Sequence, residues 1–109
     1  MAYDEKLASR ILALIKGARG VSTKRMFGGL CVLLHGNMAL GVVDDKLMVR
    51  VGPDNYESSL RQKHVKPMDF TGKPLKGMIY VTREGIQTRA ALKKWVEAGT
   101  GFARSLPPK

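Results

Sequence analysis

Residues 21–51, VSTKRMFGGLCVLLHGNMALGVVDDKLMVRV, decide the fold of this chain. Turn-forming residues interrupt the stretch three times, at 28–29, 35–37 and 44–46. Between these turns the sequence predicts short strands, at 21–27, 30–34, 38–43 and 47–51. In the last of them Leu47, Val49 and Val51 fall on one face, and Met48 and Arg50 fall on the other. Short strands joined by tight turns pair in antiparallel order, because parallel pairing needs long crossovers. The stretch therefore predicts an antiparallel meander.

The segments on either side predict helices that cover this sheet. Asp4 is a candidate N-cap for a first helix over residues 4–17. Its apolar stripe consists of Leu7, Ile11, Leu14 and Ile15. Thr88 is a candidate cap for a C-terminal helix, in which Gly99 and Gly101 each cost about 1 kcal/mol unless a close approach or a bend needs them. Between the two helices we expect a shorter helix and two more strands, at 54–63, 68–70 and 78–81. The predicted fold class is α+β, an antiparallel sheet meander flanked by N- and C-terminal helices.

Length and composition are those of one small domain. The 109 residues fit a single domain, 1–109, in which residues 105–109 are expected to form a flexible tail. The acidic N-terminus lacks the pattern of a signal peptide, and glycines interrupt the uncharged residues 26–43, so no membrane segment is expected. A single cysteine excludes an intrachain disulfide and suits a reducing compartment. We therefore expect a cytoplasmic protein.

The formal net charge of +10 makes nucleic acid a possible partner. The densest basic segment carries five cations against one acid, Asp69; the cations are Arg61, Lys63, Lys66, Lys73 and Lys76. One interpretation is a surface that contacts phosphates of nucleic acid or another anion. The other is a solvated loop whose charges point outward independently of each other. The sequence leaves both open.

Catalytic and metal-binding residue sets are not recognisable in this sequence. Cys31 is the only thiol, and its nearest histidine, His35, is four residues away, about 13 Å along a strand. His64 would have to meet Cys31 through folding. One cysteine and two scattered histidines do not supply a zinc site, and the Asp44-Asp45 pair suits a turn. We expect no catalytic residue, no metal, no cofactor and no enzymatic activity.

The segment Lys24-Arg25-Met26-Phe27-Gly28-Gly29 resembles the signature of the TfoX N-terminal-domain family, also called TfoX/Sxy. Later segments follow in the family's order up to a C-terminal helix with Trp95, so that the resemblance covers roughly residues 7–104. It implies an α+β fold similar to that of secretion chaperones, a dimer in many members, and a role in regulating competence for DNA uptake. Longer members add a C-terminal domain, so a stand-alone single-domain member is expected here. The resemblance implies no catalytic residue.

The motif itself has a structural and a functional interpretation. Met26 and Phe27 suit the core, and Gly28 and Gly29 permit a bulge or sharp bend into the next strand. Arg25 either locks that bend through hydrogen bonds or contacts an anion or a partner beside the glycine amides. The leading hypothesis is a homodimeric regulatory or protein-interaction domain with an unidentified protein partner. Direct binding of nucleic acid is the alternative.

Overall fold

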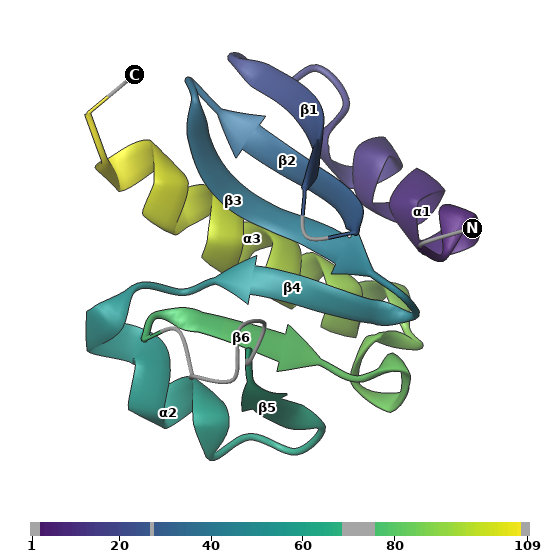
Figure 1. Cartoon of the computed structure of the whole chain (residues 1–109), viewed down its shortest axis with the longest axis vertical. Coiled ribbons are helices and arrows are strands. Elements are labelled where there is room, and N and C mark those ends of the chain that lie inside the picture. Colours follow the sequence, from purple (N-terminus) through teal and green to yellow (C-terminus); the bar gives the residue numbers. More distant parts are fainter. Residues whose placement is uncertain (1–2, 27, 69–75, 108–109) are drawn as a thin grey trace.

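The computed structural model describes residues 3–26, 28–68 and 76–107. It consists of an antiparallel sheet with two long helices against one of its faces (Figure 1). The strands are β1 (Val21–Met26), β2 (Gly29–Leu34), β3 (Asn37–Val43), β4 (Lys46–Arg50), β5 (Val65–Pro67) and β6 (Met78–Val81). The helices are α1 (Glu5–Ile15), α2 (Tyr56–Leu60) and α3 (Arg89–Ser105), with short 3-10 turns η1 (Pro53–Asn55) and η2 (Arg83–Ile86). The α+β class predicted from the sequence is confirmed.

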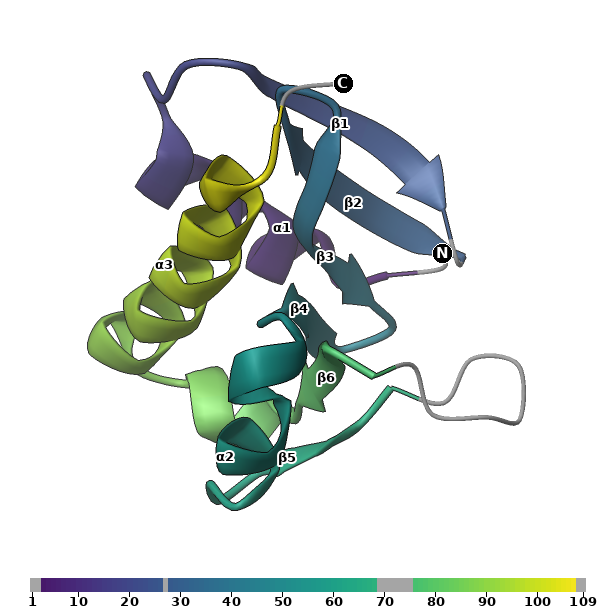
Figure 2. The ribbon, with the colours of Figure 1, turned by 90° about the vertical axis from the view of Figure 1, so that its left-hand side faces the viewer.

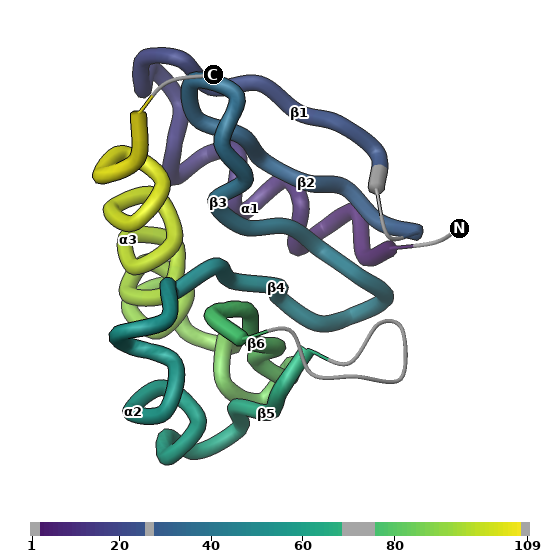
Figure 3. The backbone as a smooth tube through the Cα atoms, turned by 60° about the vertical axis from the view of Figure 1, so that its left-hand side comes forward, coloured from purple at the N-terminus to yellow at the C-terminus, as the bar shows by residue number. Residues whose placement is uncertain are grey.

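The six strands lie in the order β1-β2-β3-β4-β6-β5, and every neighbouring pair is antiparallel. The first four form the predicted meander. The last two differ from a simple meander, because β6 pairs with β4 and leaves β5 at the outside. After β4 the chain leaves the sheet through η1 and α2 and returns as β5, which forms the outer edge of the sheet. Strand β6 then lies between β4 and β5 (Figure 3).

Helices α1 and α3 cover one face of the sheet (Figure 2). Alternating residues of the central strands meet them there, among them Leu40, Leu47 and Val49, none of which is exposed. Both predicted caps are present: Asp4 accepts hydrogen bonds from two backbone amides of α1, and Thr88 accepts one from Ala91 in α3. The main core therefore lies between this face and the two helices.

The opposite face carries a second, smaller apolar cluster. Its fully or almost fully buried members are Cys31, Met48, Met68 and Met78. Leu33, Met38, Val43 and Tyr80 pack against them and are partly buried. Both faces of the central strands are thus apolar, although only one of them is covered by α1 and α3.

The predicted second helix over residues 54–63 is too long. The structure has η1 followed by the five residues of α2. Gly52, at φ 88°, precedes a 3-10 turn that begins at Pro53, where the missing amide hydrogen costs no hydrogen bond. The strand expected at residues 68–70 is found instead at Val65–Pro67, and residues 69 and 70 lie outside the described part. Between residues 3 and 107, every described helix is too short or too polar to span a bilayer.

Candidate interaction surface at the sheet edge

The motif resembling the TfoX signature begins on the first strand of the sheet, which is an edge strand. Among the described residues β1 pairs with β2 alone, in a register that runs from Val21 opposite Leu34 to Met26 opposite Gly29. The backbone groups of β1 that point away from β2 are therefore unpaired over the part of the chain that the structure describes. We call Ser22, Thr23, Lys24 and Arg25 the open edge; all four are exposed.

The polar composition of the open edge has a simple structural cause. Side chains of a strand alternate between the two faces, and at β1 neither α1 nor α3 nor the second apolar cluster covers them. Four consecutive polar residues leave neither face of this strand apolar. This pattern of four polar residues is the sequence signal that marks an edge strand here.

The glycines of the motif shape the turn between β1 and β2. Gly28 has φ 74°, a left-handed conformation that glycine adopts without steric cost. A Cβ atom added to Gly29 would overlap the carbonyl oxygen of Val42 in β3. Phe27 and the side chain of Met26 lie outside the described residues. Gly29 therefore allows a close approach of two strands.

Arg25 has no partner that would lock this turn. Its side chain is exposed, and it forms no hydrogen bond or ion pair with any residue between 3 and 107 that the structure describes. The one ion pair within 4.0 Å in this part of the chain joins Lys46 and Asp44, at 3.7 Å. The locking role considered for Arg25 is thus not seen, and its guanidinium group faces solvent.

The opposite edge of the sheet, formed by β5, is a poorer place for another strand to pair. Strand β5 has three residues, and one of them, Pro67, has no amide hydrogen to donate. Short edge strands and prolines discourage pairing with another chain. Strand β1 has six residues and no proline, so it is the better template for an added strand.

The basic residues beyond α2 are spread out. Arg61 caps the end of α2, Lys63 follows in the turn, and Lys66 lies in β5 opposite Tyr80. Lys76 precedes β6, so the hairpin register places it about four residues, or about 13 Å, from Lys66. All four are exposed, and no described carboxylate lies within 4.0 Å of them. Lys73 lies outside the described residues. They form a row rather than a cluster.

Helix α3 extends this row at the α2 end. The ammonium group of Lys94 donates a hydrogen bond to the side-chain oxygen of Gln62, which is the residue after Arg61. The same ammonium group lies 4.7 Å from the centre of the Trp95 ring. The segment that follows α2 therefore meets α3 at one corner of the molecule, although some thirty residues separate them in the sequence.

Cys31 and the two histidines do not come together. Cys31 is buried in β2, and its burial raises the pKa of the thiol, which disfavours the nucleophilic thiolate. His64 precedes β5, four strand spacings away from β2, or about 19 Å. His35 is exposed in the β2–β3 turn. No group of three or more potential metal ligands occurs within the described ranges.

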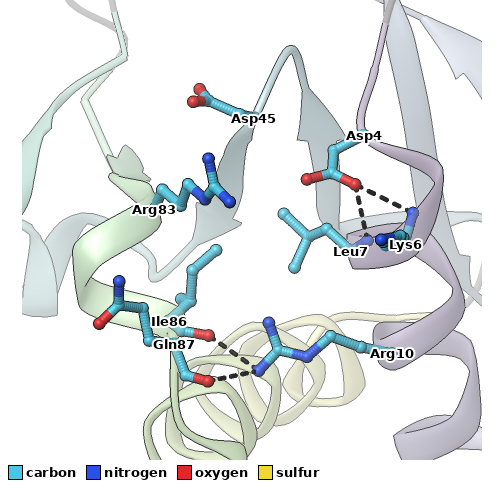
Figure 4. Close-up of a pocket in the computed structure, with 8 residues that line it drawn as sticks. All are labelled: Asp4, Lys6, Leu7, Arg10, Asp45, Arg83, Ile86 and Gln87. Carbon is cyan, nitrogen blue, oxygen red and sulfur yellow. Dashed lines mark hydrogen bonds between the residues drawn. The ribbon is translucent and has the colours of Figure 1, made fainter.

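A hollow that could not be expected from the sequence lies between α1, the β3–β4 turn and η2 (Figure 4). Its volume is about 280 Å³, and its lining residues are Asp4, Lys6, Leu7, Arg10, Asp45, Arg83, Ile86 and Gln87. They come from three segments some forty residues apart, with no common spacing. Only folding brings them together.

Comparison with known proteins identifies the family but gives no individual relative. No curated protein and no solved structure gives a significant match. The profile of the TfoX N-terminal domain matches residues 13–103, which is most of the chain and includes all the described strands and most of α3. The chain belongs to the TfoX N-terminal domain family.

Proposed function

We propose that this chain is a non-enzymatic, cytoplasmic regulatory or protein-interaction domain that works as a homodimer, with the role in competence and DNA transformation that the family resemblance implies. The observation that carries the proposal is the open edge of β1, where Lys24 and Arg25 of the family motif are exposed and unpartnered among the described residues. An edge strand with free backbone groups is a template for another strand. Cys31 and His64 lie too far apart to form a catalytic dyad, which supports a binding role over a catalytic one.

Charge restricts how two copies can pair along β1. In an antiparallel dimer centred on Lys24, like charges would face each other across the two-fold axis. A register centred on Thr23, which then faces Thr23 of the second copy, instead places Lys24 opposite Ser22 and Arg25 opposite Val21. The two sheets then join into one, and the cations lie at the two ends of the junction. We expect this register.

Lysines introduced at the centre of the junction test this arrangement. The double variant Ser22→Lys/Thr23→Lys places four additional cations at the two-fold axis of the dimer. Like charges on directly opposed strands oppose pairing, so we expect the dimer dissociation constant to rise at least about tenfold. Sedimentation velocity over a concentration series measures this shift. Both side chains are exposed, so the monomer fold should persist, as far-UV circular dichroism would verify.

The matched control is Ser9→Lys/Ala90→Lys, which adds the same charge at exposed positions of α1 and α3. We expect it to leave the dissociation constant unchanged. An unmodified protein that stays monomeric at every concentration would contradict self-association. Equal effects of the two double variants would contradict the location at β1.

Nucleic-acid binding is the second candidate function. It is favoured by the row formed by Arg61, Lys63, Lys66 and Lys76, which no described carboxylate neutralises. Lys94 joins this row at the corner between α2 and α3. Cations spaced along a surface suit the regular phosphates of a nucleic acid backbone. Contacts to phosphates alone would distinguish little between one base sequence and another.

The salt dependence of binding to a labelled DNA duplex tests this candidate by fluorescence anisotropy. Each phosphate contact contributes about 0.9 to the slope of log affinity against log salt concentration. Arg61→Gln/Lys63→Gln should therefore lower the slope by about two. Lys16→Gln/Arg19→Gln removes the same charge beyond α1 and should leave the slope nearly unchanged. Absence of binding at low salt, or equal losses in both variants, would eliminate this function.

A further inference from the structure

The hollow between α1 and η2 contains a guanidinium group that the protein itself holds in place. Nη2 of Arg10 donates hydrogen bonds to the carbonyl oxygens of Ile86 and Gln87, at 2.9 and 3.2 Å. These bonds tie α1 to the segment before α3 and use one of the three guanidinium nitrogens (Figure 4). The N–H groups on Nη1 and Nε have no partner among the described residues and remain available to a ligand. A group fixed in this way loses little conformational entropy when it binds.

A second guanidinium group, that of Arg83, points into the same hollow from η2 (Figure 4). It forms no ion pair or hydrogen bond with the described residues. The neighbouring carboxylate of Glu84 is occupied locally: its pKa is lowered by a hydrogen bond to its own backbone, then by one to the Thr82 side chain, with smaller contributions from His64 and Arg83. Two guanidinium groups that converge on one space form a suitable site for a carboxylate.

Two carboxylates line the hollow as well. Oδ1 of Asp4 accepts hydrogen bonds from the backbone amides of Lys6 and Leu7, at 2.9 and 3.1 Å, and Oδ2 has no such bond within the described chain. Asp45 is exposed at the β3–β4 turn and forms no ion pair within 4.0 Å with the described cations. With Lys6, the lining contains three cations and two carboxylates, so a ligand that carries both signs of charge matches it better than a plain phosphate or a simple amine.

The floor and size of the hollow restrict the ligand further. Leu7 and Ile86 are apolar lining residues that lie between the charged groups (Figure 4). The volume of about 280 Å³ corresponds to about nine water molecules and lies near the lower limit for ligand pockets. The ligand is therefore small and carries one apolar group together with both charges.

We propose that this hollow binds a small α-amino acid as its zwitterion. Arg10 and Arg83 hold the carboxylate, Asp4 and Asp45 hold the ammonium group, and Leu7 and Ile86 contact an apolar side chain. This inference does not depend on the proposed interaction at β1, because the hollow and the open edge are built from different elements. It adds a ligand site to the domain.

Titration of the full chain with L-valine, followed by amide chemical shifts in NMR spectra, tests the proposal. Isovalerate lacks only the ammonium group of valine, and isobutylamine lacks only its carboxylate. We expect saturable shifts at the lining residues with valine and at least about tenfold weaker binding of each analogue, since a charged hydrogen bond contributes about 1.5–3 kcal/mol.

Single substitutions assign each charge to its partner. Arg83→Gln should weaken valine binding about tenfold without weakening isobutylamine binding, whereas Asp45→Asn should weaken valine binding without weakening isovalerate binding. Arg61→Gln removes an exposed arginine outside the hollow and should change nothing. Isovalerate binding as tightly as valine would overturn the proposal in favour of a plain anion site. It would also be overturned if none of the standard amino acids gave saturable shifts at the lining residues.

Discussion

Replacing Gly29 with alanine is expected to destabilise the fold by about 3 kcal/mol. The new Cβ atom would overlap the carbonyl oxygen of Val42, which belongs to the backbone of β3. A backbone atom in a paired strand cannot rotate away as a side chain does, so β2 and β3 must move apart where Leu30 pairs with Val42. Urea unfolding monitored by Trp95 fluorescence measures the change.

Gly28→Ala is the control for this substitution. Gly28 has φ 74° but open space around the position of an added Cβ, so its cost is conformational strain alone, about 1 kcal/mol. If the two variants lost equal stability, the close approach to Val42 would not explain the requirement for Gly29. A larger loss at Gly29 means that this glycine of the motif is needed for packing, whatever the open edge binds.

Gly99→Ala is expected to destabilise the protein by about 2 kcal/mol, although alanine is the better helix former. The Cβ atom would lie 2.6 Å from the carbonyl oxygen of Ala39, so α3 would have to move away from β3. This displacement would loosen the packing of Trp95 and Val96, which the same helix buries. Thermal and urea unfolding both measure the effect.

Gly101 provides the matched comparison within the same helix. No atom lies within 4 Å of the Cβ position there, so Gly101→Ala should stabilise the fold by up to about 1 kcal/mol. Opposite signs for two glycines only two residues apart would separate close packing from helix propensity. Destabilisation by both would contradict this explanation. Of the two explanations that the sequence offered for glycines in this helix, close approach applies to Gly99.

Local patterns predicted most of the fold. Leu47, Val49 and Val51 alternate with residues of the other face, and this alternation correctly predicted which side chains face the helices. Thr88 correctly marked the start of α3. The order of β5 and β6 was not predictable in this way. It depends on where the chain re-enters the sheet after α2, and the residue pattern of Val65–Pro67 does not indicate that position.

The candidate sites were less accessible to sequence reasoning. Lys24 and Arg25 were identified as part of a motif, but their exposure follows from β1 being the outermost strand, which is a property of the whole sheet. The hollow depends on Arg10 reaching the carbonyl groups that precede α3, a contact across seventy-six residues. Side-chain convergence of this kind leaves no trace in spacing or composition.

The start of the chain has a practical consequence for work on this protein. Tyr3 forms a parallel β-bridge with Asp44, and the amide of Asp4 donates to the carbonyl oxygen of Asp44 at 2.7 Å. A purification tag attached ahead of Tyr3 would therefore begin beside Asp45 and the rim of the hollow. At the other terminus, Asn37 donates to the carbonyl oxygen of Pro107 at 2.9 Å, next to the β2–β3 turn. Tags for ligand titrations belong at the C-terminal end, where they leave the mouth of the hollow clear.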